Sequence, residues 1–147
     1  MQFSGTVDIA APRERVWEFL MDPNMVGSCG PGVQSIEVVD ADHFNIKAKV
    51  GVGFITATFA THCQFIERDP MDRARISARG NAPGSAVDAV GEMNLRDGAD
   101  GHTTMDWAAT VNISGTLASV GARLIEGTAN KLSAQMFTCI KTRLEAV

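Results

Sequence analysis

The spacing of apolar residues changes near Thr116, and this change limits the possible folds more than any other feature of the chain. Before Thr116, apolar and polar residues alternate over many short segments, which is typical of half-buried strands. After it, apolar residues recur at intervals of three, four and eight, with most charged residues on the opposite side. This pattern predicts one amphipathic helix of about 28 residues, reaching roughly 40 Å at ~1.5 Å per residue. Such a helix needs a broad apolar surface to cover.

The alternating segments supply that surface. Residues 2–10 are predicted as the first strand, and a helical and glycine-rich segment follows it. Six more strands are predicted at residues 33–39, 44–50, 55–63, 73–79, 87–95 and 105–113. Alternation with one apolar face indicates an antiparallel sheet that is covered on one side. The sequence therefore predicts an α+β fold in a single domain, residues 1–147, in which the long C-terminal helix covers the concave face of a seven-stranded curved antiparallel sheet.

Two short helices are predicted between the first and second strands. The first spans about residues 12–20, because Pro12 suits a first helical turn and the apolar residues after it have helical spacing. Asp22-Pro23 is typical of a cap that opens a second helix. Glycines and Pro31 then end this helix in a tight loop. This loop is either a plain turn or a lid over a cavity, and its candidate lid residues are Met25, Gly27, Cys29, Gly30 and Gly32.

The composition excludes several classes of function. The chain has 147 residues and a net charge of −4 with scattered lysines and arginines, so it has no basic footprint for nucleic acid. Its three histidines lie far apart and no Cys-x-x-Cys pair is present, so we expect no metal site. The N-terminus has no basic segment followed by an apolar run, so we expect no signal peptide and a cytoplasmic protein.

The cysteines are Cys29, Cys63 and Cys139, an odd number at wide spacing, which is not the pattern of a disulfide framework. We therefore expect free thiols, which fit a reducing compartment. Cys63 and Cys139 fall on apolar faces, where cysteine is usually a small buried hydrophobic residue. A packing or loop role is expected for all three cysteines, rather than catalysis.

The order of the elements resembles the helix-grip arrangement of the START-like or Bet v1-like (SRPBCC) superfamily, which includes polyketide cyclases and a class of plant allergens. Short motifs follow that order: Phe3-x-Gly5-x-Val7-x-Ile9, Ala11-Pro12-x-x-x-Val16-Trp17, Leu20-x-Asp22-Pro23, Cys29-Gly-Pro31-Gly32, Val50-Gly51, Asp69-Pro70, Trp107 and Gly115-x-Leu117-Ala118-x-x-Gly121-x-Arg123-Leu124. Together they resemble the CoxG family, named for the CoxG subunit of carbon monoxide dehydrogenase, over essentially the whole chain.

This resemblance implies an accessory protein rather than a catalytic subunit. Proteins of this family are encoded beside molybdenum hydroxylases of the carbon monoxide dehydrogenase type, and they are linked to recruiting the dehydrogenase to the membrane. The resemblance also makes a role with a quinone, the lipophilic electron acceptor, plausible. Some members carry a C-terminal extension with an apolar anchor, whereas this chain stops at Val147. We therefore expect only peripheral or transient contact with the membrane, and no bound cofactor apart from a quinone or another lipophilic ligand.

The inner face of the sheet is rich in small residues. A solid core under a long helix needs large side chains to reach native packing density. Rows of alanine and glycine therefore indicate either a close approach of the helix or an empty cavity, and we favour a cavity. The candidate residues for an apolar ligand site are Phe59, Ala89, Met93, Met105, Trp107, Leu124 and Met136.

Two alternatives to a binding protein stay open. A cyclase or hydratase on the same fold would need a buried polar group in the cavity, such as His62 or Asp106, and the alternation places both on the outer face. An assembly or docking factor with a filled core is the other alternative. Asp88 and Glu92 share one side of a strand, but cross-strand salt bridges with neighbouring arginines explain them better than acid–base catalysis. No catalytic residue is therefore predicted.

Overall fold

The computed structural model describes residues 1–146, and Val147 lies outside the described residues. One sheet contains seven antiparallel strands in the order β1-β7-β6-β5-β4-β3-β2. The elements along the chain are β1 (Gln2–Ile9), α1 (Arg13–Met21), α2 (Pro23–Gly27), β2 (Val33–Val38), β3 (His43–Val52), β4 (Ile55–Asp69), β5 (Arg73–Ala82), β6 (Ser85–Asp97), η1 (Ala99–Gly101), β7 (Thr103–Gly115), η2 (Thr116–Val120) and α3 (Ala122–Glu145).

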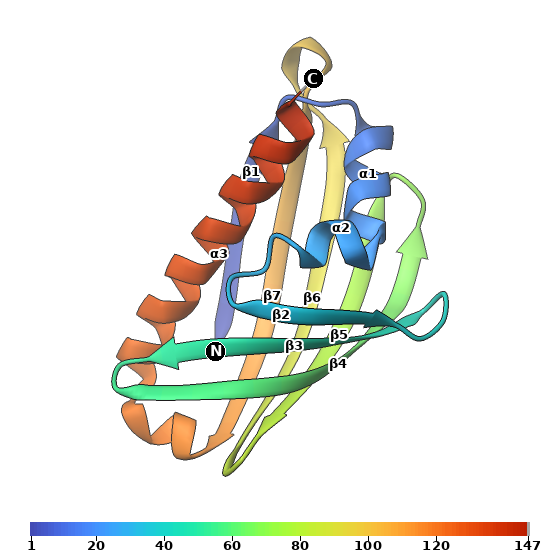
Figure 1. Ribbon diagram of the computed structural model, residues 1–147. Coiled ribbons are helices and arrows are strands. Elements are labelled where there is room, and N and C mark those ends of the chain that lie inside the picture. The colour runs from blue at the N-terminus through green and yellow to red at the C-terminus, as the bar shows by residue number, and fades with distance from the viewer. Residues whose placement is uncertain (147) are drawn as a thin grey trace.

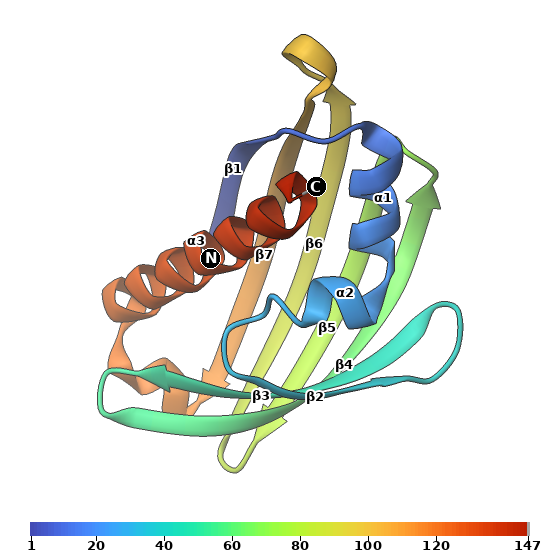
Figure 2. The ribbon, with the colours of Figure 1, turned by 45° about the horizontal axis from the view of Figure 1, so that its top comes forward.

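All three α-helices lie on one face of the sheet (Figure 1). Strands β2 and β3 cross the view while β6 and β7 stand nearly upright, so the sheet is strongly curved. In the turned view, α3 lies at the left and α1 and α2 lie at the right, all over the same face of the sheet (Figure 2). The predicted architecture is therefore confirmed: two short helices after the first strand, a curved antiparallel sheet, and a long C-terminal helix on its concave face.

The C-terminal helix does not begin at Thr116, so the predicted continuous helix is wrong at its start. Residues 116–120 form the short 3₁₀ helix η2, and Gly121 follows with φ of +98°. This positive φ is accessible to glycine and interrupts the helix. The α-helix then spans 24 residues from Ala122 to Glu145.

Cys29 and Cys139, which are 110 positions apart in sequence, form a disulfide with their Cα atoms 5.5 Å apart. The expectation of free thiols is therefore wrong for these two residues, and it no longer supports a reducing compartment. The pairing arises because the loop after α2 packs against the C-terminal half of α3, which the spacing of cysteines in the sequence cannot show. Cys63 is a free and buried cysteine.

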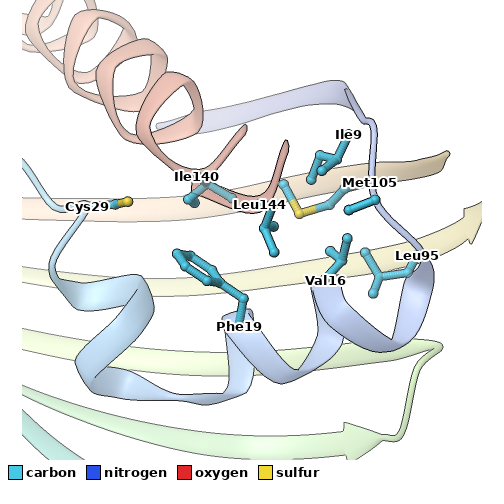
Figure 3. Packing of buried hydrophobic residues seen from close by; sticks show 9 residues of the cluster. Ile9, Val16, Phe19, Cys29, Leu95, Met105, Ile140 and Leu144 are labelled. Carbon is cyan, nitrogen blue, oxygen red and sulfur yellow. The ribbon is translucent and has the colours of Figure 1, made fainter. Parts of the chain in front are cut away.

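The core is divided into clusters at different places under the helices. One cluster joins β1, α1, β6, β7 and the end of α3 (Figure 3) and contains Ile9, Val16, Phe19, Leu95, Met105, Ile140 and Leu144. A second cluster lies near the start of α3 and contains Val52, Phe59, Leu117 and Ile125. A third, on β3 and β4, contains Phe44, Cys63 and Phe65. The two ends of α3 are thus anchored in separate clusters, with space between them.

Candidate ligand-binding cavity

A cavity of about 350 Å³ lies between the inner face of the sheet, the short helices and the C-terminal half of α3. Its walls are overwhelmingly apolar. The sheet contributes Phe44, Ile46, Cys63, Phe65, Ala74, Ile76, Gly91, Met93, Met105, Trp107 and Ala109, and the helices contribute Leu20, Met21, Val26, Gly27, Met136, Phe137 and Ile140. Ligand pockets in proteins are typically concave and apolar with a volume of this order. The cavity therefore suits a small lipophilic molecule.

Small residues on three adjacent strands keep this space open. Ala74, Gly91 and Ala109 all line the cavity, and Gly91 pairs directly with Ile76 on one side and Ala109 on the other. A Cβ atom placed on Gly91 would meet no heavy atom closer than 3.6 Å, the distance to Ile76 Cγ2. The helix does not fill the gap, because Met136 and Phe137 themselves stay only half-buried.

An aromatic pair forms part of the wall. The ring centroids of Trp107 and Phe137 lie 5.0 Å apart with 41° between the ring planes, within the range for favourable aromatic contact. Gly5 on β1 is the strand partner of Trp107, and a Cβ atom there would lie 2.8 Å from Trp107 Nε1. The missing side chain at Gly5 therefore lets the indole lie over β1 and present its face toward α3.

A second, smaller cavity of about 240 Å³ lies under the N-terminal half of α3. It is lined by apolar residues and two threonines: Ala48, Val50, Val52, Phe59, Thr61, Ala78, Gly80, Val87, Ile113, Leu117, Ile125, Thr128, Ala129 and Leu132. Ala48 and Ala78 follow Ile46 and Ile76 of the larger cavity along the inner faces of β3 and β5. The two cavities are therefore neighbours along the helix axis.

Charged groups do not converge on the larger cavity. Arg75 and Glu92 border it, but their side chains belong to the outer face, where Arg75 Nε lies 3.8 Å from Glu92 Oε2. The Cys63 thiol does lie in the wall, and burial raises its pKa to about 11, so it stays protonated near neutral pH. Within residues 1–146, no group of three or more histidine, cysteine or acidic side chains is placed to hold a metal ion.

The structure brings four of the predicted ligand-site residues together. Met93, Met105, Trp107 and Met136 line the larger cavity, and Phe59 lines the smaller one. Ala89 lies on β6 between Val87, which lines the smaller cavity, and Gly91, which lines the larger one, but it lines neither cavity itself.

Leu124 does not lie in either inner cavity, so the prediction that it lines the ligand site is wrong. It is 41% exposed and borders a surface hollow, whereas Ile125 is buried and lines the smaller cavity. Leu124 and the buried Ile140 belong to one uninterrupted helix, in which 16 residues at about 100° per residue place them about 160° apart around the axis, whereas Ile125 lies only about 60° from Ile140.

The candidate lid residues lie along α2 and the loop that follows it. Gly27 lines the larger cavity, and a Cβ atom there would approach Ile36 Cδ1 to 2.7 Å. Met25 is 39% exposed. Gly32 has φ of +77°, and a Cβ atom there would overlap the carbonyl oxygen of Lys49. The loop is therefore packed tightly against β3 at Gly32, while Cys29 attaches it to α3.

Sequence reasoning did not single out Met21, Phe44 and Phe65 as cavity residues. Phe44 and Phe65 lie across β3 and β4 with ring centroids 5.6 Å apart. The alternation assigned Phe44 to the inner face, but the predicted fourth strand ended at residue 63, two residues before Phe65. Only the longer strand and its pairing place both rings at the larger cavity. Met21 ends α1, and the position of that helix over the sheet follows from tertiary packing.

The outer face carries the predicted ion pairs. Arg79 Nε lies 2.7 Å from Asp88 Oδ1, and Arg73 Nη2 lies 2.9 Å from Glu67 Oε2. Asp106 accepts hydrogen bonds from Arg96 and Thr6 on this face, and these contacts hold the pKa of its carboxyl below the usual value. His62 likewise bonds to Asn45 at 2.7 Å. The prediction that these polar residues lie outside the cavity is confirmed.

The chain also matches a known protein family. The family model for CoxG, a subunit of carbon monoxide dehydrogenase, matches residues 5–145. The chain belongs to the CoxG family. The resemblance seen in the sequence motifs is thereby confirmed, and the family name ties this CoxG-family protein to carbon monoxide dehydrogenase in general. No curated protein matches the chain.

Solved structures show the same fold at low sequence identity. A conserved protein from Geobacillus kaustophilus superposes with a TM-score of 0.92 at 21% identity, covering 99% of this chain and 95% of that one. A START superfamily protein from Mycobacterium smegmatis gives 0.71 at 12% identity, with 98% and 97% covered. The Zhui aromatase/cyclase from a Streptomyces species gives 0.68 at 16% identity, with 99% and 93% covered. These likenesses establish a START-like helix-grip fold for this CoxG-family chain.

Proposed function

We propose that this protein is a non-catalytic carrier of a lipophilic molecule, with a quinone as the leading candidate, and that it serves a molybdenum hydroxylase of the carbon monoxide dehydrogenase type. The cavity of about 350 Å³ with its apolar walls carries this proposal. Four methionines in the wall give it adaptable shape, because the unbranched thioether side chain has several low-energy conformations. The tilted Trp107–Phe137 pair offers ring faces to a planar ligand.

The distribution of polar groups favours a carrier over an enzyme. General acid–base catalysis needs a titratable group within hydrogen-bond reach of the reacting atoms. The Cys63 thiol in the wall is held protonated, while His62 and Asp106 lie on the outer face. The fold is shared with an aromatase/cyclase, so a cyclase or hydratase is the alternative function, and it requires turnover that depends on a cavity residue.

The first experiment measures the melting temperature of the purified full chain with and without quinones, fatty acids and sterols. A ligand at about 100 Kd should add roughly 2.7 kcal/mol to the free energy of unfolding. Ala109→Leu places a larger side chain in the cavity and should abolish the shift. Thr110→Leu, at the next residue on the exposed outer face, is the matched control and should leave it unchanged. A shift that survives Ala109→Leu would place the ligand elsewhere.

Ligand identity has its own test. Organic extraction of the purified protein followed by mass spectrometry should recover a quinone or another lipophilic molecule. Failure to retain any ligand, combined with no thermal shift and with co-purification of a dehydrogenase, would favour the alternative of an assembly or docking factor.

Peripheral contact with the cytoplasmic face of the membrane is also part of the proposal. None of the helices in residues 1–146 is long and apolar enough to cross a bilayer. Phe54 at the β3–β4 turn is 93% exposed, and the adjacent Gly53 packs against Leu124, itself 41% exposed. Arg123 and Lys131 border the same hollow as Leu124. Exposed apolar side chains beside basic ones suit an anionic lipid surface.

Vesicle sedimentation tests this contact. The protein should bind vesicles that contain anionic phospholipid more strongly than neutral ones, and Phe54→Ser should weaken binding without lowering the melting temperature, because the side chain is almost fully exposed. Val90→Ser, which removes an exposed apolar side chain from the outer face of β6, is the control. Equal binding by both variants and the parent chain would exclude the hairpin tip as the contact.

A further inference from the structure

The Cys29–Cys139 disulfide joins the two walls of the larger cavity that do not belong to the sheet. Cys29 lies two residues after Gly27, which lines the cavity at the end of α2. Cys139 lies on α3 beside Ile140, which lines the cavity from the opposite wall. Figure 3 shows Cys29 in the loop after α2, with its sulfur directed away from that loop and beneath α3. The bond therefore fixes the position of α2 and its loop relative to the long helix.

We propose that this disulfide is a reversible redox switch that controls passage of the apolar ligand between α2 and α3. The inference rests on the proposed carrier function. In the oxidised protein, α2 and the loop are held against α3 and ligand exchange is slow. In the reduced protein, the two thiols are free to separate, the wall formed by α2 opens more often, and exchange is faster.

The remaining contacts between this segment and α3 are non-covalent, and they include apolar packing of Val26 against the cluster that contains Ile140. Arg143 donates a hydrogen bond to the carbonyl oxygen of Met25 at 3.3 Å and contacts Ser28 Oγ. Its guanidinium carbon lies 5.4 Å from the centre of the Phe19 ring. Arg143, Met25 and Ser28 are all exposed. Because exposed polar contacts exchange readily with water, they constrain the loop much less than a covalent bond does.

The helix that must move is itself short. α2 has five residues, and Asp22 caps it by accepting a hydrogen bond from the backbone N–H of Asn24 at 3.0 Å. A helix of this length has little stability of its own, so its position depends on what it is attached to. Gly32, packed under Lys49, and Asp22 mark the two ends of the segment that can swing.

The chemistry is thiol–disulfide exchange with a low-molecular-weight disulfide and its thiol as partners. A thiolate of the protein attacks the small disulfide, which releases one small thiolate and leaves a mixed disulfide. The second protein thiolate then attacks the protein sulfur of that mixed disulfide, forms Cys29–Cys139 and releases the second small thiolate. Two electrons pass from the protein to the small disulfide, which becomes two thiols once protons are taken up. The reverse sequence reduces the protein.

Two observations separate this pair from Cys63. Cys63 is 5% exposed and its neutral thiol is favoured by burial, so it is a poor nucleophile for exchange. Cys139 is half-buried on α3, where a small thiol can approach, whereas Cys29 is 5% exposed. A small thiol can therefore begin the exchange at Cys139 but not at Cys63.

The first test needs no ligand. The full chain is equilibrated in glutathione buffers of increasing reducing strength at pH 7, and N-ethylmaleimide then counts its free thiols by mass. We expect Cys29 and Cys139 to become labelled together without denaturant, while Cys63 stays unlabelled. Amide hydrogen exchange of residues 23–33 should be at least about tenfold faster in the reduced form. A disulfide that is reduced only after unfolding, or equal exchange in both forms, would overturn the switch.

The second test measures release of ubiquinone-1. Trp17→Phe leaves Trp107 as the remaining tryptophan, so its fluorescence reports the cavity. Release into excess lipid vesicles should be about tenfold faster in the reduced protein, and Cys29→Ser should release fast under both conditions. Thr138→Ser, an exposed change beside Cys139 on α3, is the control and should respond to redox conditions like the parent chain. Equal release rates refute the switch. If ubiquinone-1 never quenches Trp107, the quinone proposal fails, and the exchange data decide the switch by themselves.

Discussion

Replacing Gly91 by alanine tests whether the larger cavity is truly empty at its floor. Gly91 lies on β6 with Ile76 and Ala109 as its strand partners, and all three line the cavity. The new methyl group would lie 3.6 Å from Ile76 Cγ2, an ordinary van der Waals distance, so it needs no rearrangement. The substitution should therefore stabilise the free protein.

The magnitude follows from two contributions. Burying one additional methyl group contributes up to about 0.8 kcal/mol. Removing glycine from a strand interior contributes roughly 0.5–1 kcal/mol, because glycine loses more backbone freedom on folding than alanine does. Together they predict an increase of about 1–2 kcal/mol in the free energy of unfolding, and a melting temperature higher by about 3–6 °C for a chain of this size. Differential scanning calorimetry on the ligand-free protein measures both.

Gly5→Ala is the matched control, since it makes the same chemical change on the same face of the same sheet. There the methyl group would lie 2.8 Å from Trp107 Nε1, so the indole must move. Overpacking of this kind costs about 1–3 kcal/mol, which exceeds the gain from removing glycine. We expect a lower melting temperature and a shifted tryptophan emission. If Gly91→Ala destabilises the protein as much as Gly5→Ala does, the floor of the cavity is filled and the reasoning fails.

Three further substitutions test other parts of the structure. Thr103 is fully buried and its hydroxyl donates to the Ala11 carbonyl at 2.7 Å, so Thr103→Val should lower the free energy of unfolding by about 1–3 kcal/mol in urea denaturation, unlike Thr110→Val on the exposed face. Burial raises the pKa of the Cys63 thiol from 9.0 to about 11, so the contribution of this group to the free energy of unfolding is complete below pH 9 and disappears as the pH rises to about 11. Cys63→Ala should therefore flatten the plot of the free energy of unfolding against pH between these values. The chain has no tyrosine that would titrate in the same range. Gly32→Ala forces a side chain onto φ of +77° and into the Lys49 carbonyl, so it should lower the melting temperature and speed hydrogen exchange in residues 23–33.

The sequence predicted the sheet well because strand patterns are local. Alternation identified all seven strands, and it placed Met93, Met105 and Trp107 on the inner face together with the small residues Ala74 and Ala109. These assignments require only that apolar and polar residues alternate along a strand with one face toward water, and this alternation is visible within about ten residues of sequence.

Other features depend on contacts between distant segments and were beyond local reasoning. The Cys29–Cys139 pair requires a loop to lie against a helix 110 residues away. Leu124 was assigned inward because apolar residues at intervals of four and eight were placed on one face, but over many residues these intervals drift away from the 3.6-residue repeat of the helix. The buried Ile140 fixes which face of α3 meets the sheet, and that face includes Ile125 instead of Leu124.

The way α3 is held explains why an open cavity and a disulfide occur together. Ile125 near its start is 7% exposed, and Ile140 near its end is 1% exposed, whereas Leu132 and Met136 between them are only half-buried. A helix that is anchored at both ends and spans empty space forgoes the burial that its middle would otherwise contribute. At the end near Ile140, the facing wall is built from α1 and α2, with nine and five residues, which are too short to be stable alone. Val16 and Phe19 bury α1 in the core, whereas α2 buries only Gly27, so α2 is the less firmly packed part of this wall. A covalent bond from the loop after α2 to α3 therefore bears directly on whether the cavity opens.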